Sequence, residues 1–191
     1  MIREESMIKK IVSKLILFIA MALRPFNQHA YDKINTKRLK WLGVDISSKE
    51  GDYSFISPSA FIDGSNYSLI SIGKRTVISN DVILLTHDAS IKQGLRAIGK
   101  NIPLGKNVTF LKPISIGDNC FIGIRAIVLP GAHLGNNTIV AAGSIIAGKT
   151  YPSDVILAGV PAKVIGKTSE WAEKHYIMND YIGAENEQDG E

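Results

Sequence analysis

Aliphatic side chains recur at every sixth position through the second half of the chain. The run is unbroken over six repeats, and the residue four positions after each aliphatic is always small. The same step extends the run backwards to Leu104 and Phe110 and recurs in an earlier block. The aliphatic positions are Ile116, Ile122, Val128, Leu134, Val140 and Ile146, the small ones Cys120, Ala126, Ala132, Thr138, Ser144 and Thr150, and the earlier block Ile56, Ile62, Ile72 and Ile78.

A six-residue period predicts a parallel β-helix, because it matches neither the turn of an α-helix nor the alternation of a hairpin strand. Each repeat supplies one short strand and one bend, and three repeats complete a coil. Successive coils then stack about 4.8 Å apart, with the aliphatic side chain pointing inward and the small one at a crowded corner. We expect this β-helix to occupy residues 51–167.

Residues 1–50 are predicted to form a helical segment. Its first helix ends at Arg24-Pro25 and has an apolar face, with Lys9, Lys10 and Lys14 lying off that face. We expect this helix to pack on its own protein or on a neighbouring subunit, with a peripheral membrane contact as a second interpretation. The apolar face holds Ile8, Ile11, Val12, Leu15, Ile16 and Ile19.

The apolar run at residues 15–23 is too short to cross a bilayer. Because Ala20-Met21-Ala22 imitates a cleavage site, a secretory signal peptide is an alternative interpretation of the same segment. A second helix is predicted over residues 31–42, ending at Gly43, and its lysines and arginine are interpreted as a solvated face. No aromatic interleaving accompanies these bases, so a nucleic-acid partner is not expected.

Charge is unevenly distributed along the chain. The formal net charge is +4, yet residues 179–191 contain five acids and no Lys or Arg, so the rest carries +9. Residues 168–191 are predicted to form a short helix near 168–177 followed by this acidic tail. The single cysteine, Cys120, excludes an internal disulfide and any multi-cysteine metal site. The tail acids are Asp180, Glu185, Glu187, Asp189 and Glu191.

Three stretches point to one family. They are residues 86–88 (Thr-His-Asp), residues 113–123 within the repeat, and residues 158–165, which read Ala-Gly-Val-Pro-Ala-Lys-Val-Ile. With the repeat, they resemble the hexapeptide acyltransferases, and most closely the sugar and polysaccharide O-acetyltransferases of the maltose/galactoside, capsule and O-antigen type. The resemblance implies an all-β fold, a left-handed parallel β-helix, which is an exception to the usual right-handed crossover.

The resemblance also implies acetyl transfer from acetyl-CoA to a saccharide hydroxyl, with a histidine as general base. His87 is the best placed of the four histidines, because it follows the register at Leu84 and precedes the largest gap in the repeat. A loop over about residues 88–103 is expected to leave the prism there and to help form the acceptor pocket. Asp88 is a candidate catalytic partner of His87, and either Asp88 or Asp63 would orient the imidazole or bind a sugar hydroxyl. Asp63 and Arg96 are candidate substrate-binding residues.

Acetyl-CoA is expected to lie along a groove between two β-helices of a homotrimer, as the resemblance implies. Small side chains permit close approach of its pantetheine arm to the backbone, and lysines would meet its phosphates. The candidate cofactor-binding residues are Gly123, Ala141, Ala142, Gly143, Lys149, Lys163 and Lys167. No metal site is expected, because only His87 and His133 fall within the coils and Cys120 reads as core filler. The resemblance favours a cytoplasmic location, with the inner membrane face as an alternative.

Two other functions fit the same features. One keeps the histidine and the acetyl donor but acts on an amino sugar or an antibiotic, as xenobiotic acetyltransferases do. The other is a non-catalytic β-helix scaffold, which leaves His87 and the motif at residues 158–165 without a role.

Overall fold

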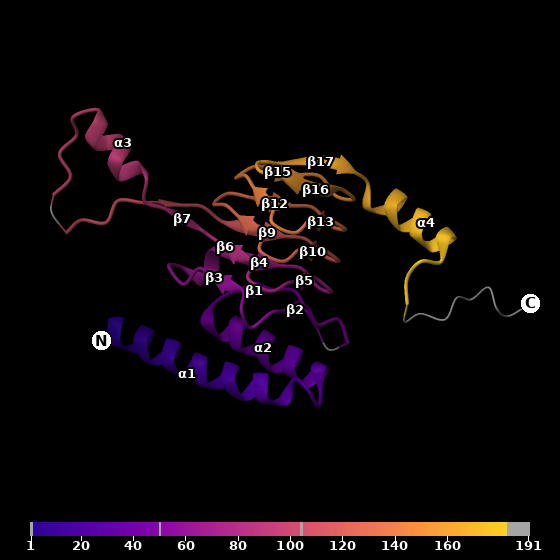
Figure 1. Cartoon of the computed structure of the whole chain (residues 1–191). Helices are drawn as coiled ribbons and strands as arrows, with labels where there is room; N and C mark the ends of the chain where they lie inside the picture. The colour runs from indigo at the N-terminus through magenta and orange to yellow at the C-terminus, as the bar shows by residue number, and fades with distance from the viewer. Residues whose placement is uncertain (1, 50, 104, 183–191) are drawn as a thin grey trace, which may run out of the picture.

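The computed structural model describes residues 2–49, 51–103 and 105–182, and for residues 2–6 the backbone only. Three parallel sheets form the sides of a prism, with helices at both ends (Figure 1). The chain visits the three sheets in the same order in every coil, which confirms the predicted parallel β-helix. The first sheet holds β1 (Asp45–Ile46), β4 (Ile70–Ile72), β9 (Ile114–Ile116), β12 (His133–Leu134) and β15 (Thr150–Tyr151).

The other two sheets complete the prism. The second holds β2 (Phe55–Ile56), β5 (Val77–Ile78), β10 (Phe121–Ile122), β13 (Ile139–Val140), β16 (Ile156–Gly159) and β17 (Ala162–Gly166), and the third holds β3 (Phe61–Ile62), β6 (Ile83–Leu84), β11 (Ile127–Val128) and β14 (Ile145–Ile146). Only β17 pairs antiparallel within these sheets; it folds back on β16. The prism begins at Asp45, earlier than the predicted boundary at residue 51.

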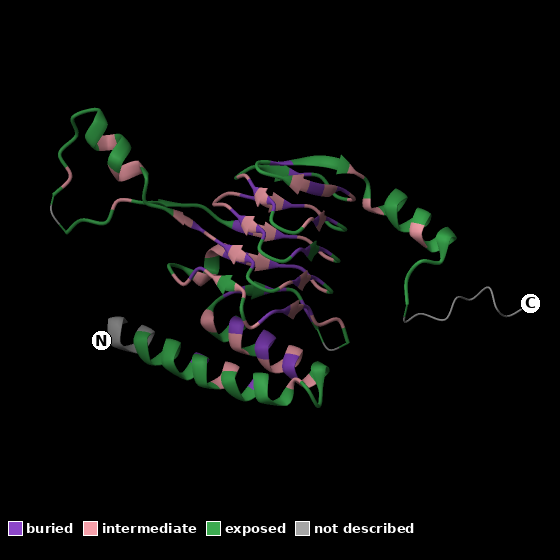
Figure 2. Cartoon of the chain, in the orientation of Figure 1, coloured by how far each residue is buried: buried purple, intermediate pink, exposed green. Residues whose placement is uncertain are grey.

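The six-residue step fixes which residues stack. Phe121 pairs with Ile139 and Ile127 pairs with Ile145, so in the unbroken run a coil advances by eighteen residues, which is three repeats. The repeating aliphatic side chains fill the interior of the prism, and Ile122, Val128 and Val140 are fully buried (Figure 2). The small residues at the corners are buried too: Cys120, Ala126, Ala132, Thr138 and Ser144.

The repeat departs from strict periodicity at its two ends. Thr150, expected at a small corner position, is exposed, because the chain reaches the next inward position in five residues and places Tyr151 there. Phe110, expected as an inward aliphatic, is 44% exposed and lies outside the prism in β8 (Phe110–Leu111). Leu104 lies outside the described residues. The extra residues before Ile72 form a short 3-10 turn, η1 (Tyr67–Leu69).

A long arm interrupts the stack after β6. It leaves the prism at β7 (His87–Asp88), carries the short helix α3 (Ile91–Ala97), and returns through β8, which pairs antiparallel with β7. The arm is therefore longer than the predicted loop over residues 88–103. It has a two-stranded stem, so its base is held by backbone hydrogen bonds although its tip stands away from the prism (Figure 1).

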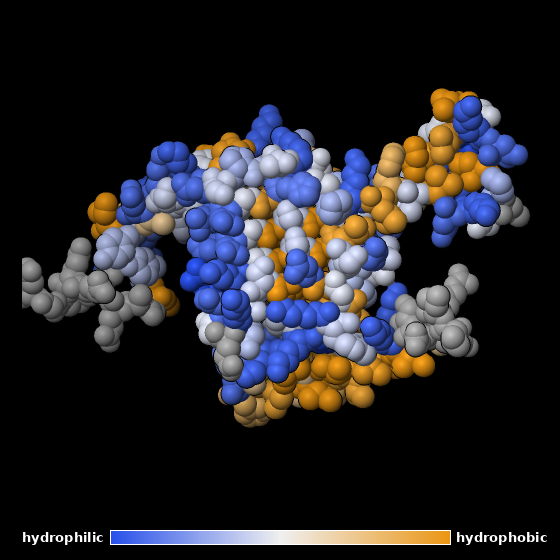
Figure 3. All heavy atoms as spheres, turned by 180° about the vertical axis from the view of Figure 1, so that it is seen from behind, coloured by the Kyte–Doolittle hydropathy of each residue, from blue (hydrophilic) through white to orange (hydrophobic). Residues whose placement is uncertain are grey.

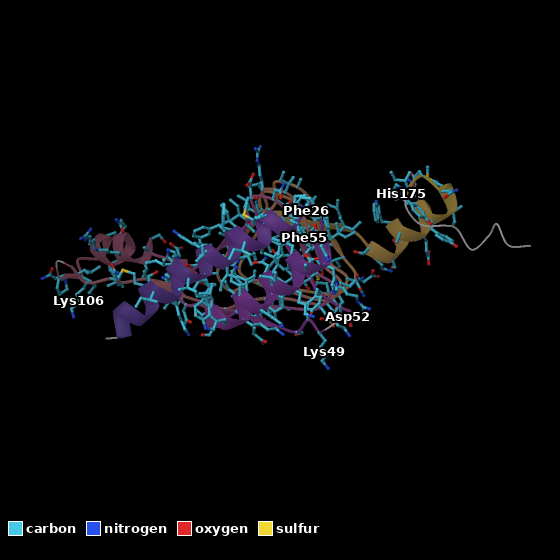
Figure 4. All side chains as sticks on the ribbon, turned by 90° about the horizontal axis from the view of Figure 1, so that it is seen from below. Phe26, Lys49, Asp52, Phe55, Lys106 and His175 are labelled. Atoms are coloured by element: carbon cyan, nitrogen blue, oxygen red, sulfur yellow. The ribbon has the colours of Figure 1, made fainter. Side chains whose placement is uncertain are left out.

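Two helices close the end of the prism where the chain begins. α2 (Gln28–Leu42) packs on β1 and β2, and α1 (Ile2–Leu23) packs on α2 (Figures 1 and 4). Asn27 caps α2 by accepting a hydrogen bond from the backbone of Ala30, and Gly43 ends it in the left-handed conformation at a φ of 111°. No helix among the described residues is long and apolar enough to cross a membrane.

At the other end the chain leaves the prism through α4 (Thr168–Met178), close to the predicted helix over residues 168–177. This helix stands away from the coils, on the side opposite the arm, as His175 and Lys106 show when the molecule is seen from below (Figure 4). Of the tail acids, Glu185, Glu187, Asp189 and Glu191 lie outside the described residues.

The inward positions are predicted to dominate stability. Ile122→Ala should lower the free energy of unfolding by about 2–5 kcal/mol, because it leaves a cavity in a fully buried layer. Ile124→Ala, two residues away and 43% exposed, is the matched control and should change it by less than about 0.5 kcal/mol. Urea unfolding followed by circular dichroism measures both. Equal losses in the two variants would contradict the inward assignment.

Candidate functional site

His87 stands where the chain leaves the third sheet to enter the arm. Its ring nitrogen Nδ1 lies 2.7 Å from Oδ2 of Asp63 and 3.1 Å from Oγ of Ser65. Asp63 follows β3, which pairs with β6, so it comes from the coil directly below the departure point. Stacking of two successive coils therefore brings together two residues that are twenty-four positions apart.

Asp63 is a buried carboxylate surrounded by donors. Its Oδ2 accepts hydrogen bonds from the backbone N of Thr86 at 2.9 Å and from the Thr86 hydroxyl at 2.7 Å, and its Oδ1 accepts one from the backbone N of Ser65 at 2.9 Å. Burial alone would raise the pKa of Asp63, but the hydrogen bonds from Thr86, His87 and Ser65 outweigh it and hold the pKa well below its usual range. Asp63 is therefore ionised at neutral pH.

An ionised Asp63 fixes the proton position on a neutral His87. A carboxylate can only accept, so Nδ1 of the imidazole must carry the hydrogen and donate it to Asp63. The lone pair of the neutral ring is then on Nε2, which no described residue bonds. The His87 side chain is 37% exposed, so the imidazole is partly open to an incoming group. The pair has the arrangement of a histidine base and an orienting carboxylate.

A cavity of about 450 Å³ opens beside His87, between the turn after β3 and the return strand of the arm. Ser65, Asn107 and Thr109 supply polar groups, and Val108 and Leu111 supply apolar wall; Ala89 completes the lining. The sequence-based prediction does not include Asn107 and Thr109, because it ends the loop at residue 103 and places Phe110 in the repeat. The unbroken polar character of residues 105–107 was the signal that the excursion continues.

Asp88 and Arg96 do not join this cavity. The carboxylate of Asp88 accepts a hydrogen bond from the backbone N of Ser90 at 2.8 Å, and that bond lowers its pKa. It makes no hydrogen bond to His87, so in the structure the orienting contact belongs to Asp63 and not to Asp88. Arg96 is exposed on α3 and is absent from the cavity lining, which does not favour its predicted substrate contact.

A second groove continues along the same edge of the prism, above the arm. Its volume is about 340 Å³, and Lys112 and Gly148 lie in it; the rest of its lining is Leu85, Asp88, Phe110, Leu129 and Pro130. A side chain at Gly148 would collide with the carbonyl oxygen of Pro130, so glycine is required for the two coils to stack. Lys149 follows, with its ammonium 5.1 Å from the centre of the Tyr151 ring.

The small residues predicted to bind the cofactor occupy a different edge. Gly123 precedes the corner between the second and third sheets, and residues 141–143 form the same corner one coil above. A Cβ at Gly123 would lie 2.6 Å from the backbone N of Ala142, so the coils approach closely there. Ala142 and Gly143 are exposed, and Gly143 has a φ of 69°.

The two C-terminal lysines differ in their positions. Lys163 on β17 pairs with Ala158, near the corner that continues the edge of Gly123 and Ala142. Lys167 lies beyond the other end of β17 and forms a 3.0 Å ion pair with Glu170. Within one chain, the small-residue corner and Lys163 therefore lie on one edge of the prism, and His87 and Lys149 lie on another.

Among the described residues, no three His, Cys, Asp or Glu side chains are grouped as metal ligands would be. His133 accepts or donates at 2.8 Å to the Ser115 hydroxyl on the first sheet, and Cys120 is buried in the core. Burial raises the pKa of the Cys120 thiol, as expected for a side chain that fills space.

Comparisons with known proteins agree with this geometry. Residues 113–147 match the family model described as the hexapeptide repeat of succinyl-transferase. The chain is 31% identical over 150 residues to galactoside O-acetyltransferase of Escherichia coli, covering 69% of this chain and 68% of that protein. It is 34% identical over 148 residues to protein CapG of Staphylococcus aureus, covering 78% of this chain and 80% of that protein.

The fold matches a solved structure over almost its whole length. A galactoside acetyltransferase in complex with coenzyme A superposes with a TM-score of 0.61 at 23% identity, covering 95% of this chain and 91% of that one. At this identity the likeness concerns the fold alone, and it extends over the helices at both ends.

Asp63 should contribute to stability in a pH-dependent way. Asp63→Asn is expected to lower the free energy of unfolding at pH 7 by about 1–3 kcal/mol, because donors on Thr86 and His87 lose a charged acceptor. The folded-state pKa is depressed, so the wild-type contribution is complete above the unfolded Asp pKa of about 4 and is lost as the pH falls below it.

Urea unfolding at fixed chain concentration, at a series of pH values from neutral to strongly acid, tests this. The gap between wild type and Asp63→Asn should close in acid. Asp88→Asn is the control: among the described residues its exposed carboxylate is hydrogen-bonded to Ser90 alone, so its gap should be much smaller at every pH. A gap that stays constant down to the most acid pH would show that the charge of Asp63 is not responsible.

Proposed function

This chain belongs to the hexapeptide-repeat acetyltransferases, and on that basis we propose that it transfers the acetyl group of acetyl-CoA to a hydroxyl group of a saccharide or glycoconjugate. The observation that carries the proposal is the Asp63–His87 pair, whose imidazole lines a polar-rimmed cavity. The galactoside O-acetyltransferase relative supports a saccharide acceptor. We propose too that the coils wind left-handedly, as the resemblance of the repeat implies.

The chemistry needs one base. Nε2 of His87 removes the proton of the acceptor hydroxyl as its oxygen attacks the carbonyl carbon of the thioester. The tetrahedral intermediate collapses with cleavage of the carbon–sulfur bond, and the imidazolium returns the proton to the departing thiolate. Asp63 stays ionised throughout, holds the ring in the tautomer with a free Nε2, and stabilises the imidazolium between the two steps.

The cavity beside His87 has the composition of a carbohydrate site. Ser65, Asn107 and Thr109 offer hydroxyl and amide groups that can both donate to and accept from a polyol, and Val108 and Leu111 offer an apolar surface for the face of a sugar ring. None of its lining residues is an acid, so the cavity offers no countercharge to a protonated amine. This favours a hydroxyl acceptor over the amino-sugar or antibiotic alternative.

Assembly would complete the site. The small-residue corner with Lys163 and the edge with His87 and Lys149 lie on different edges of one prism, so a single chain does not present both to one ligand. We propose a homotrimer in which the His87 edge of one subunit meets the Gly123–Ala142 edge of the next, with acetyl-CoA in the groove between them. Gly143 would share that groove, and the phosphates would meet Lys163 or Lys149.

Loss of the base should abolish turnover without unfolding the protein. His87→Ala is expected to lower kcat by about 10²–10⁴-fold with little change in the KM for acetyl-CoA. His133→Ala is the matched control, because that histidine bonds Ser115 on a different sheet. Thiol release from acetyl-CoA with a panel of saccharides gives the rates, and mass spectrometry distinguishes ester from amide products. Near-normal turnover by His87→Ala would overturn the assignment.

A shared site predicts complementation between two inactive variants. His87→Ala removes the base from one edge, and Ala142→Trp obstructs the exposed corner of the other. Co-expressed with different tags and purified as mixed trimers, the two variants should recover about a third of wild-type activity, because one of the three interfaces in every mixed trimer carries no lesion. A site contained in one chain would recover none, and sedimentation at one chain mass of 20.8 kDa would exclude the trimer.

A further inference from the structure

The outward side of α1 is an apolar surface. Along its described length, large apolar side chains face away from the rest of the molecule, and Phe18 is 70% exposed. We call this surface the outer face of α1. A band of hydrophobic atoms lies along the base of the molecule in Figure 3. The outer face consists of Met7, Ile8, Ile11, Leu15, Phe18 and Ile19, which are 51–70% exposed.

Polar contacts hold the outer face outward. The buried residues in the described part of α1 are small: Ser13 is 3% exposed and Ala20 is fully buried. Nη1 of Arg38 on α2 donates to the Ser13 hydroxyl at 2.9 Å, and Nζ of Lys10 donates to the carbonyl of Gly64 at 3.3 Å. Turning the apolar side inward would break both contacts. The helix thus packs on its own chain, one of the two predicted arrangements, but does so away from its apolar face.

Lysines border the outer face. The charged side chains of α1 that the structure describes are Lys9, Lys10 and Lys14, and all three are exposed. Lys9 lies over the ring of Trp41, 5.4 Å from its centre, and Trp41 is itself 42% exposed. An apolar stripe with cations and an aromatic ring at its margins has the pattern of helices that lie in the plane of a membrane surface.

We propose that the outer face of α1 docks on an anionic phospholipid bilayer, with the helix parallel to the surface. The lysines complement anionic headgroups, whereas a second copy of α1 facing the first would bring like charges together. A trimer interface on the sides of the prism would also leave the outer face uncovered, because α1 lies at the base of the molecule (Figures 1 and 3). The proposal does not depend on the acetyl-transfer chemistry.

Vesicle binding by the full chain tests the proposal. Co-sedimentation with vesicles of phosphatidylcholine containing phosphatidylglycerol should be clear, and much weaker with phosphatidylcholine alone. The triple variant Ile11→Ser, Leu15→Ser, Phe18→Ser should bind at least about tenfold more weakly. The double variant Lys9→Gln, Lys14→Gln, which keeps the Lys10–Gly64 contact, should lose most of the preference for anionic vesicles and the sensitivity to salt.

Two controls keep the outcome interpretable. Ile177→Ser with Met178→Ser removes comparably exposed apolar side chains from α4 and should leave binding unchanged. In a Trp171→Phe background Trp41 is the single tryptophan, so its emission should shift to the blue only when the base meets lipid. Circular dichroism establishes that each variant is folded.

Three results would overturn the proposal. One is absence of binding to anionic vesicles by the folded wild type. The second is equal binding by wild type and the serine triple variant. The third is a fall in oligomer size, measured by light scattering without lipid, in the serine variant alone, which would show that another copy of the chain covers the outer face.

Discussion

The strand register between stacked coils is the constraint on which the rest of the structure depends. Each strand is only two to five residues long and has almost no stability by itself, so it exists because the strands above and below complete its hydrogen bonds. That register places Ile122 over Ile78 and under Val140, and it fills the prism with branched aliphatic side chains. Any insertion has to leave the stack and return in phase, which is what the arm between Thr86 and Lys112 does.

The same stacking of coils brings the residues of the candidate site together. The lower coil places Asp63 directly after β3, and the coil above it departs into the arm at His87. Stacking of the two coils gives a carboxylate with several donors and an imidazole that is bonded through Nδ1 and half-exposed. The arm's return strand then supplies Asn107 and Thr109, so the insertion that exposes the histidine also encloses its surroundings.

Much of this could be predicted from the sequence, and the failures share a physical reason. Periodicity identified the inward residues from Ile116 to Ile146 and His87 at the departure point, because both are properties of consecutive residues. It misplaced Phe110 and Thr150, although both fit the six-residue spacing of the sequence. At Phe110 the backbone has left the prism, and before Tyr151 the repeat is one residue shorter. The choice of Asp63 over the adjacent Asp88 depends on which coil lies beneath which, and one sequence does not contain that information directly.

The two ends of the prism have a consequence for the state of the protein in solution. A stack of parallel strands ends in unpaired backbone groups, which are a template for another stack. At the lower end, Tyr31 and Asn35 of α2 donate side-chain hydrogen bonds of 2.6 and 3.1 Å to the carbonyl of Ile56, so the edge carbonyl is already occupied. At the upper end, β17 reverses direction over β16 and offers an antiparallel edge instead. Both devices oppose end-to-end polymerisation of the coils into fibres, so the length of the solenoid is fixed by its caps.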